Sequence, residues 1–278
     1  MNMKKVLILL LLLSVLAVLS AIAIQAPSEV PSAEFIAQAL IDQEQLCGQS
    51  LDVAYTITIN NAHHSDCRYV RTPDTLFLDM KKESSLRRCR LDRNSKESRR
   101  VTIPNNGGTI SGVIDNKRAG ELGNRDIPDP VRYNLDVVTL PELIRRGEVQ
   151  ADKQDIDGSS CWLIETPSKY MPDTVYRVWV DPTIGFCPRR IEISWPHKQP
   201  SIIDFLQYKD LGNGVWFPME IHNKFQFVHG DTNEMLESVE SIKDVKIDQT
   251  VSKSELDVVF PKGCHVYNMI TDAEYVQP

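Results

Sequence analysis

The sequence lacks most of the motifs by which enzymes are identified. It contains no nucleophile elbow, no HExxH metal motif, no P-loop and no dinucleotide-binding glycine pattern. Its acidic residues are scattered, so no carboxylate pair stands out. Because a catalytic site needs residues with assignable roles, we predict that the protein is not an enzyme and has no catalytic residues, metal or cofactor. A hydrolase without a recognisable motif stays open as an alternative.

An excess of basic charge is missing as well. The chain has 31 Lys and Arg residues against 38 Asp and Glu residues, which gives a net charge of −7. This balance disfavours nucleic acid as a partner. Beyond residue 24 the sequence also lacks any apolar run that could span a bilayer, for which roughly 20 residues are needed.

The N-terminus carries the long apolar run of the chain. Lys4 and Lys5 precede the uncharged stretch Val6–Ile24, which contains the small-residue sequence Ala21-Ile22-Ala23. A charged start, an apolar core and an A-x-A site are typical of a secretory signal peptide. We therefore predict a signal peptide over residues 1–23 and export to the periplasm or cell envelope. The alternative is a retained membrane anchor, because the run nearly reaches spanning length.

Six cysteines follow this segment, at positions 47, 67, 89, 161, 187 and 264. They form no CxxC or zinc-ribbon pattern. The first, Cys47, lies too far from the apolar run to be a lipid-anchored N-terminal cysteine. An even number of cysteines in an exported chain suggests disulfides, but a domain of about 255 residues does not need them to fold.

A Pro- and Ser-containing linker over residues 24–31 is predicted to lead into a single domain over residues 32–278. Ser32 is suited to N-cap a helix, and apolar residues recur at helical spacing through Leu40. This pattern predicts an amphipathic helix that ends near Cys47.

From there the apolar period changes to two, which is typical of half-buried strands. The segments with this period are Leu51–Ile59, Leu76–Met80, Val175–Val180, Arg190–Trp195 and Phe225–Phe227. Many links between them are too short for the crossovers that parallel strands need. We therefore predict one mainly antiparallel sheet whose apolar side chains face the N-terminal helix.

Two other segments separate the strands. Pro141 is suited to start a short helix, which stops at Gly147. The stretch Pro104–Pro130 is rich in Gly, Asn, Asp and Pro and is predicted to be a long loop.

A polar stretch, His63-His64-Ser65-Asp66-Cys67, places four potential metal ligands within five residues. Zinc sites use such ligands. However, neighbouring residues on a strand point to opposite faces, and no second ligand pair lies at a suitable spacing. We interpret the stretch as a polar turn between two strands, with a metal site as the minor alternative.

The segment Lys81–Arg100 holds nine basic and three acidic residues. It could contact anionic lipid headgroups or an acidic protein partner. The favoured interpretation is a solvent-exposed pair of strands whose charges keep a sheet edge from pairing with other chains.

The second half of the chain resembles a known family. The residues that carry the resemblance are Asp157-Gly158, Val178-Trp179-Val180-Asp181-Pro182, Gly185, Pro188, Arg190-Ile191-Glu192, Gly214-Val215-Trp216-Phe217-Pro218, Phe260-Pro261-Lys262-Gly263 and Val266. With this set, Leu140–Val266 is similar to the LolA/LolB/RseB-like superfamily, the outer-membrane lipoprotein-sorting type. Cys264 departs from the pattern, which has a small polar residue there.

The resemblance implies an α+β, mainly β fold. Its sheet is strongly curved and antiparallel, an unclosed half-barrel with helices covering the concave face. By implication, the protein is a non-enzymatic carrier that holds a lipid, an acyl chain or another apolar group between sheet and helix. Burial of apolar surface, at about 25 cal/mol per Å², would supply the binding energy. The alternative is an envelope regulatory module of RseB type that binds a protein partner.

Large apolar side chains on the predicted helix and strands are candidates for lining this cleft, although aromatic residues dominate ordinary cores as well. The candidates are Phe35, Leu40, Trp162, Trp179, Trp195 and Trp216.

The strand order also bears on the cysteines. In the simplest meander, one strand separates Cys161 from Cys187, and another separates Cys67 from Cys89. Two strand spacings amount to about 9.6 Å, whereas the Cα atoms of a disulfide lie no more than about 7 Å apart. We therefore expect neither pair to be bonded.

Overall fold

The computed structural model describes residues 29–116, 127–196, 198–229 and 232–278. The predicted signal peptide or anchor over residues 1–23 lies outside these ranges, as does most of the predicted linker. Across the described ranges, no helix is both long enough and apolar enough to cross a membrane.

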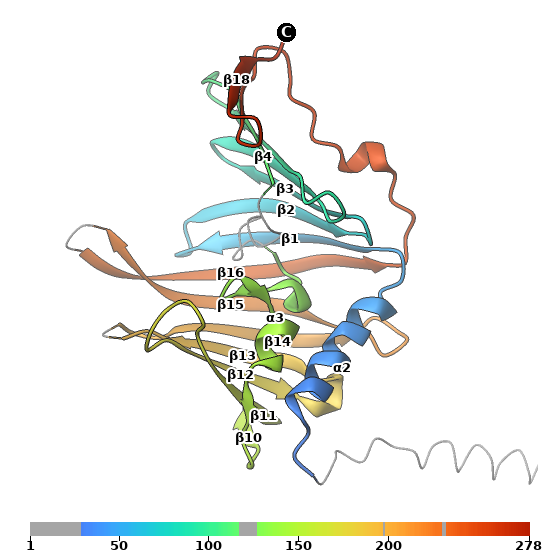
Figure 1. Cartoon of the computed structure of the whole chain (residues 1–278), viewed down its shortest axis with the longest axis vertical. Helices are drawn as coiled ribbons and strands as arrows, with labels where there is room; N and C mark the ends of the chain where they lie inside the picture. The colour runs from blue at the N-terminus through green and yellow to red at the C-terminus, as the bar shows by residue number, and fades with distance from the viewer. Residues whose placement is uncertain (1–28, 117–126, 197, 230–231) are drawn as a thin grey trace, which may run out of the picture.

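One large curved sheet forms the body of the molecule (Figure 1). From edge to edge its strands are β10 (Gln154–Ile156), β11 (Ser159–Pro167), β12 (Val175–Asp181), β13 (Cys187–Ser194), β14 (Ser201–Asp210), β15 (Trp216–His229), β16 (Thr232–Ile247), β1 (Leu51–Ile59), β2 (His63–Arg71), β3 (Thr75–Lys82), β4 (Ser85–Asp92), β5 (Ser98–Pro104), β6 (Ser111–Asp115), β17 (His265–Asn268) and β18 (Ala273–Val276). Strand β9 (Glu148–Val149) pairs with β11, while β7 (Asn134–Leu135) and β8 (Val138–Thr139) form a separate hairpin. The two outermost strands of this order do not pair with each other, so the sheet is the predicted unclosed half-barrel.

The period-two segments are strands at the predicted places. Strand β1 coincides with Leu51–Ile59, and its residues alternate between buried and half-buried. The other four segments lie within β3, β12, β13 and β15, except that Trp195 follows the last residue of β13.

The strand pairs of the sheet are antiparallel, as predicted, apart from β6 and β17, which are parallel. This pair corrects the prediction of a single long loop over Pro104–Pro130, because residues 111–115 within it form β6. The loop-like composition misleads here because β6 lies between β5 and a strand from the C-terminus of the chain, and no local pattern marks such a distant partner.

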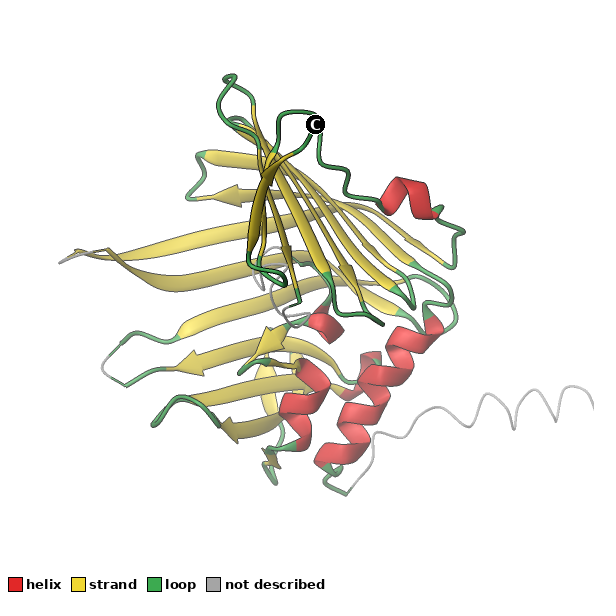
Figure 2. Cartoon of the chain, turned by 45° about the horizontal axis from the view of Figure 1, so that its top comes forward, coloured by secondary structure: helices red, strands yellow, loops and turns green. Residues whose placement is uncertain are grey.

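Two helices lie against one face of the sheet, which we call the inner face (Figure 2). Helix α2 (Ala33–Leu46) begins where predicted, since the Ser32 hydroxyl accepts a hydrogen bond from the Phe35 N–H at 3.1 Å. Helix α3 (Leu140–Arg145) begins with a capping box, in which Glu142 accepts a bond from the Thr139 N–H at 2.9 Å. Short 3₁₀ helices are η2 (Pro130–Arg132), η3 (Pro182–Ile184) and η4 (Lys253–Leu256).

Apolar clusters cover both faces of the sheet. On the inner face, a first cluster packs α2 and α3 against β11–β15. A second cluster lies on β1–β4 and includes Cys47, the C-cap residue of α2. Strands β12 and β13 therefore meet α2 as predicted, whereas β1 and β3 bury their apolar residues in the second cluster. On the opposite, outer face, the C-terminal segment around η4 covers β2–β6.

Candidate functional site

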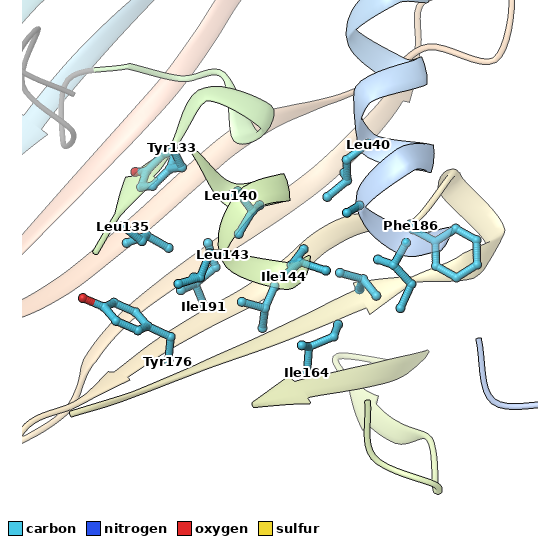
Figure 3. Packing of buried hydrophobic residues seen from close by; sticks show 14 of the residues in the cluster. Leu40, Tyr133, Leu135, Leu140, Leu143, Ile144, Ile164, Tyr176, Phe186 and Ile191 are labelled. Carbon is cyan, nitrogen blue, oxygen red and sulfur yellow. The ribbon is translucent and has the colours of Figure 1, made fainter. Parts of the chain in front are cut away.

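The helices and the inner face enclose an apolar interior (Figure 3). Helix α2 contributes Ile36, Ala37 and Leu40, and α3 contributes Leu143 and Ile144, all fully buried. Strands β11–β15 supply the opposite wall. This is the region where the resemblance places an apolar ligand.

Two of the six predicted cleft residues, Leu40 and Trp162, are buried within this interior. Two others lie at strand ends, outside the buried cluster. Trp216 starts β15, and its backbone N–H donates to the Gln43 side chain at 3.0 Å. Trp195 is half-buried just beyond β13, and its indole donates to the Ser201 hydroxyl at 3.4 Å.

The other two lie away from it. Phe35 is 55% exposed, and its ring packs edge-on against Phe186 with the ring centroids 5.4 Å apart. Trp179 packs on the outer face with Cys161, because its neighbours Val178 and Val180 occupy the inner positions of β12. Contact of any of the six with a ligand stays a prediction.

A small cavity of about 20 Å³ lies where the two inner clusters meet. Leu40, Leu51 and Trp216 line its apolar side, and Arg71 and Asp129 line its polar side. A cavity of this size holds about one water molecule. An acyl chain could enter here only if the surrounding side chains moved.

A buried ion pair forms the polar side of this cavity. Arg71, at the end of β2, donates to Asp129 at 2.6 Å, and both side chains are at least 95% buried. Asp129 also accepts a bond from the Tyr69 hydroxyl at 3.3 Å and N-caps η2 through the Val131 N–H at 3.2 Å. The carboxylate therefore has partners that offset much of the cost of its burial.

Glu44, in the last turn of α2, faces three guanidinium groups. It pairs with Arg132 of η2, with Arg93 of the β4–β5 turn at 3.5 Å and with Arg71 at 3.9 Å. Burial alone raises the pKa of Glu44, but the nearby Arg71, Arg132 and Arg93 charges outweigh that effect and lower it below its ordinary value. We call Arg71, Arg93, Arg132, Glu44 and Asp129 the arginine cluster.

A groove of about 630 Å³ opens above the arginine cluster. It runs between the C-terminal end of α2, the β2–β3 turn, η2 and the start of α3. Four arginines and two glutamates line it: Arg71, Arg93, Arg132, Arg145, Glu44 and Glu142. The groove can accept an anionic group, whereas the interior below it is filled by apolar side chains.

The sequence analysis missed most of the arginine cluster. One signal was available at Arg71, which follows Cys67 and Tyr69 at a spacing of two. That spacing places a charged residue on the buried face of a strand, where it needs a partner. No local pattern connects it to Asp129 or Arg132, because the contacts form only in the fold.

The polar stretch His63–Cys67 is not a turn, so that prediction is wrong. The stretch lies within strand β2, and the turn precedes it at Asn60 and Asn61, whose φ angles are 48° and 54°. Within β2, His63, His64 and Asp66 are exposed, whereas Ser65 and Cys67 point inward. No group of three or more His, Cys, Asp or Glu residues suited to a metal occurs in the described part of the chain.

The basic segment Lys81–Arg100 does not form a sheet edge, which corrects that interpretation. Its strands β4 and β5 are each paired on both sides. Several of its arginines are matched by carboxylates, such as Arg88 by Asp79 at 3.1 Å and Arg99 by Glu97 at 2.7 Å. Arg93 is the member of the segment that lines the groove.

All six cysteines are buried. Strand β12 separates Cys161 from Cys187, and β3 separates Cys67 from Cys89, so the expectation that neither pair is bonded is confirmed. Burial raises the pKa of Cys161 to about 12 and that of Cys47 to about 11. Their thiols are therefore protonated and unreactive near neutral pH.

No protein-family model matches the chain, and no curated protein sequence matches it either. The matches come from solved structures. An outer membrane lipoprotein-sorting protein domain from Vibrio parahaemolyticus aligns with 81% of this chain and 97% of its own, at 9% identity and a TM-score of 0.51.

Two further matches have lower TM-scores. An uncharacterised conserved protein from Thermus thermophilus aligns with 84% of this chain and 98% of its own, at 9% identity and a TM-score of 0.38. Pseudomonas aeruginosa MucB, in a complex with MucA, aligns with 77% of this chain and 99% of its own, at 10% identity and a TM-score of 0.19. Of these three, the Vibrio domain shares the fold of this chain, which confirms the LolA-like fold that the sequence resemblance implied.

Proposed function

We propose that the chain is an exported, non-enzymatic binding module that holds a lipid or acyl chain between its inner face and helices α2 and α3. The observation that carries the proposal is the continuous apolar wall of β11–β15, which two helices cover. Of the 14 residues of α2, Ile36, Ala37 and Leu40 are buried.

The burial energy of two α2 side chains is similar to the energy that a bound acyl chain would supply. Burying one large aliphatic side chain contributes about 1.5–3 kcal/mol, so Ile36 and Leu40 hold α2 with roughly 3–6 kcal/mol. A buried methylene contributes about 0.8 kcal/mol, so a chain of about eight methylenes returns a similar amount. An acyl chain of this length can therefore offset the loss of these two side-chain contacts.

Lipid content tests this proposal. We expect native mass spectrometry of protein purified without detergent to show a bound lipid, released by organic solvent. Replacing Trp195 with Glu should abolish this lipid, because Trp195 follows Ile191 and Ile193 at a spacing of two, and it is only half-buried, so a charge there is compatible with folding. The control is Tyr170→Glu, since Tyr170 is 53% exposed. A folded protein that takes up no lipid from vesicles contradicts the carrier function.

A protein-binding role is the second candidate. Strand β18 is one of the two outer edges of the sheet, with a neighbouring strand on one side only. Tyr275 and Val276 on β18 are exposed, as is Tyr267 on β17. An exposed edge strand with apolar side chains can accept a strand from a partner. Loss of partner capture after Tyr275→Lys, with lipid binding absent from the parent protein, would favour this role.

A further inference from the structure

We infer that the groove above the arginine cluster binds the phosphate of an anionic headgroup through Arg93 and Arg132. This inference rests on the proposed function, because it assigns the headgroup of the lipid whose chain lies in the interior. Guanidinium groups suit this task, since their planar forks match phosphate oxygens.

The cluster has one positive charge more than its carboxylates neutralise. Arg71, Arg93 and Arg132 face Glu44 and Asp129. Asp129 is engaged by Arg71 at 2.6 Å, so Glu44 is left to Arg93 and Arg132. Each guanidinium group has five N–H donors, so the single Glu44 carboxylate cannot accept hydrogen bonds from all the donors of two of them.

Both of these arginines have N–H donors without a hydrogen-bond acceptor among the described residues. Arg132 Nε is buried and has no hydrogen-bond partner among the described residues. Arg93 has a 3.2 Å bond to the Thr72 carbonyl and the 3.5 Å contact with Glu44. Burial, followed by the neighbouring Arg132 charge, lowers the pKa of Arg93 despite Glu44.

The C-terminal end of α2 accounts for part of this charge. It carries roughly half a negative charge, and its last turn has no basic residue of its own. This half charge offsets part of the one positive charge that the two carboxylates leave, and a bound anion would offset the rest.

The groove adjoins the small cavity beneath it. Glu44, Cys47, Arg71 and Val131 line both, and the cavity reaches Leu40 and Trp216. A headgroup in the groove would place its acyl chain at the seam between the two inner clusters. This adjacency favours a lipid phosphate over free phosphate.

Three probes separate headgroup from chain. Dihexanoyl phosphatidylglycerol carries an anionic phosphate, dihexanoylglycerol has the same chains with no phosphate, and sodium phosphate has no chain. Affinities are measured by isothermal titration calorimetry on the full chain. We expect the wild type to bind phosphatidylglycerol about tenfold more tightly than dihexanoylglycerol, the size of one charge-assisted hydrogen bond.

The arginine variants and the Glu44 variant should change the preference for phosphatidylglycerol in opposite directions. Arg93→Gln and Arg132→Gln should each bring the two lipid affinities together without changing dihexanoylglycerol binding. Glu44→Gln should increase the preference for phosphatidylglycerol, because it removes the competing carboxylate; a purely structural role would not produce this gain. Arg99→Gln, which removes a remote exposed ion pair of the same kind, should change nothing.

Each outcome decides a different point. Equal affinities in the wild type, or a preference that survives both arginine variants, overturns the headgroup site and leaves the proposed function standing. Stabilisation by sodium phosphate that needs Arg93 and Arg132, with neither lipid bound, supports the anion site and overturns the lipid function. No binding of any probe overturns both. Melting temperatures verify folding, and Arg93→Gln decides alone if Arg132→Gln does not fold.

Discussion

At the residue scale, Arg71 and Asp129 join strand β2 to the 3₁₀ helix η2. Arg71 ends β2, and Asp129 N-caps η2 while also bonding Tyr69. A buried ion pair adds little stability over an apolar pair, but removing one member leaves an uncompensated charge. The pair thereby fixes η2, and with it Arg132, over the end of α2.

Asp129→Ala should destabilise the protein by about 3–5 kcal/mol, because Arg71 is left buried without its closest partner. Urea denaturation measures the change. Arg88→Ala, which breaks an exposed pair with Asp79, should cost no more than about 1 kcal/mol. Similar losses for both variants would contradict the structural role of the buried pair.

Glu44 should make stability depend on acid pH. Its pKa in the folded protein lies below the ordinary value of 4.5. Its stabilising contribution is therefore fully present above the unfolded-state pKa and is lost as the pH falls through the folded-state pKa. We expect Glu44→Gln to have a lower melting temperature than the wild type at about pH 7, and the difference to close at about pH 3. A difference that is unchanged between the two pH values would contradict this linkage.

At the scale of elements, Gln43 connects α2 to the sheet by two hydrogen bonds. Its side chain donates to the Gly214 carbonyl at 2.8 Å and accepts from the backbone N–H of Trp216 at 3.0 Å. Gly185 lies on its other side, with φ at +69°, and a Cβ there would come within 2.6 Å of Gln43 Nε2. Helix α2 is therefore held by the two hydrogen bonds of Gln43 in addition to its three buried side chains.

Gln43→Ala should loosen α2 while leaving the sheet intact. Losing both bonds should cost about 1–3 kcal/mol. Hydrogen exchange should rise in residues 33–46 and stay unchanged in β1–β3, and lipid uptake should become faster. Gln38→Ala is the control, because Gln38 bonds Asp42 within the helix itself. Uniformly faster exchange throughout the chain would show that the Gln43 hydrogen bonds do not act locally.

Elements with local signals were predictable, and elements with distant partners were not. Ser32 and the spacing through Leu40 sufficed for α2, and the period of two sufficed for β1. By contrast, β6 depends on a strand near the C-terminus. The arginine cluster likewise assembles from α2, β2, the β4–β5 turn and η2, whose proximity no local pattern encodes.

At the scale of the whole molecule, the sheet has a core on each face. The inner core holds the helices, whereas the outer core is closed by the C-terminal segment, in which Leu256, Val258 and Phe260 pack on β2–β6. Gly112 of β6 permits this closure, since a Cβ there would lie 2.7 Å from the Phe260 ring. The C-terminus therefore stabilises the N-terminal half of the chain.

Two adjacent residues test this arrangement. Phe260 is 9% exposed and Val259 is 70% exposed. Phe260→Ala should lower the free energy of unfolding by about 3 kcal/mol or more, whereas Val259→Ala should change it by no more than about 0.5 kcal/mol. Urea titration measures both. Equal effects would contradict the packing of the C-terminal segment on the outer face.

The pairing of β1 with β16 has a consequence for folding. It joins Leu51 to Ile247, about 200 residues away in sequence, and it connects the strands β1–β6 to the strands β9–β16. Contacts between such distant residues raise contact order and slow the folding reaction. An elongating chain that has not reached residue 232 lacks β16 and exposes a free edge at β1. The sheet therefore becomes continuous only after β16 has been synthesised, and the strands β1–β6 must stay free of aggregation until then.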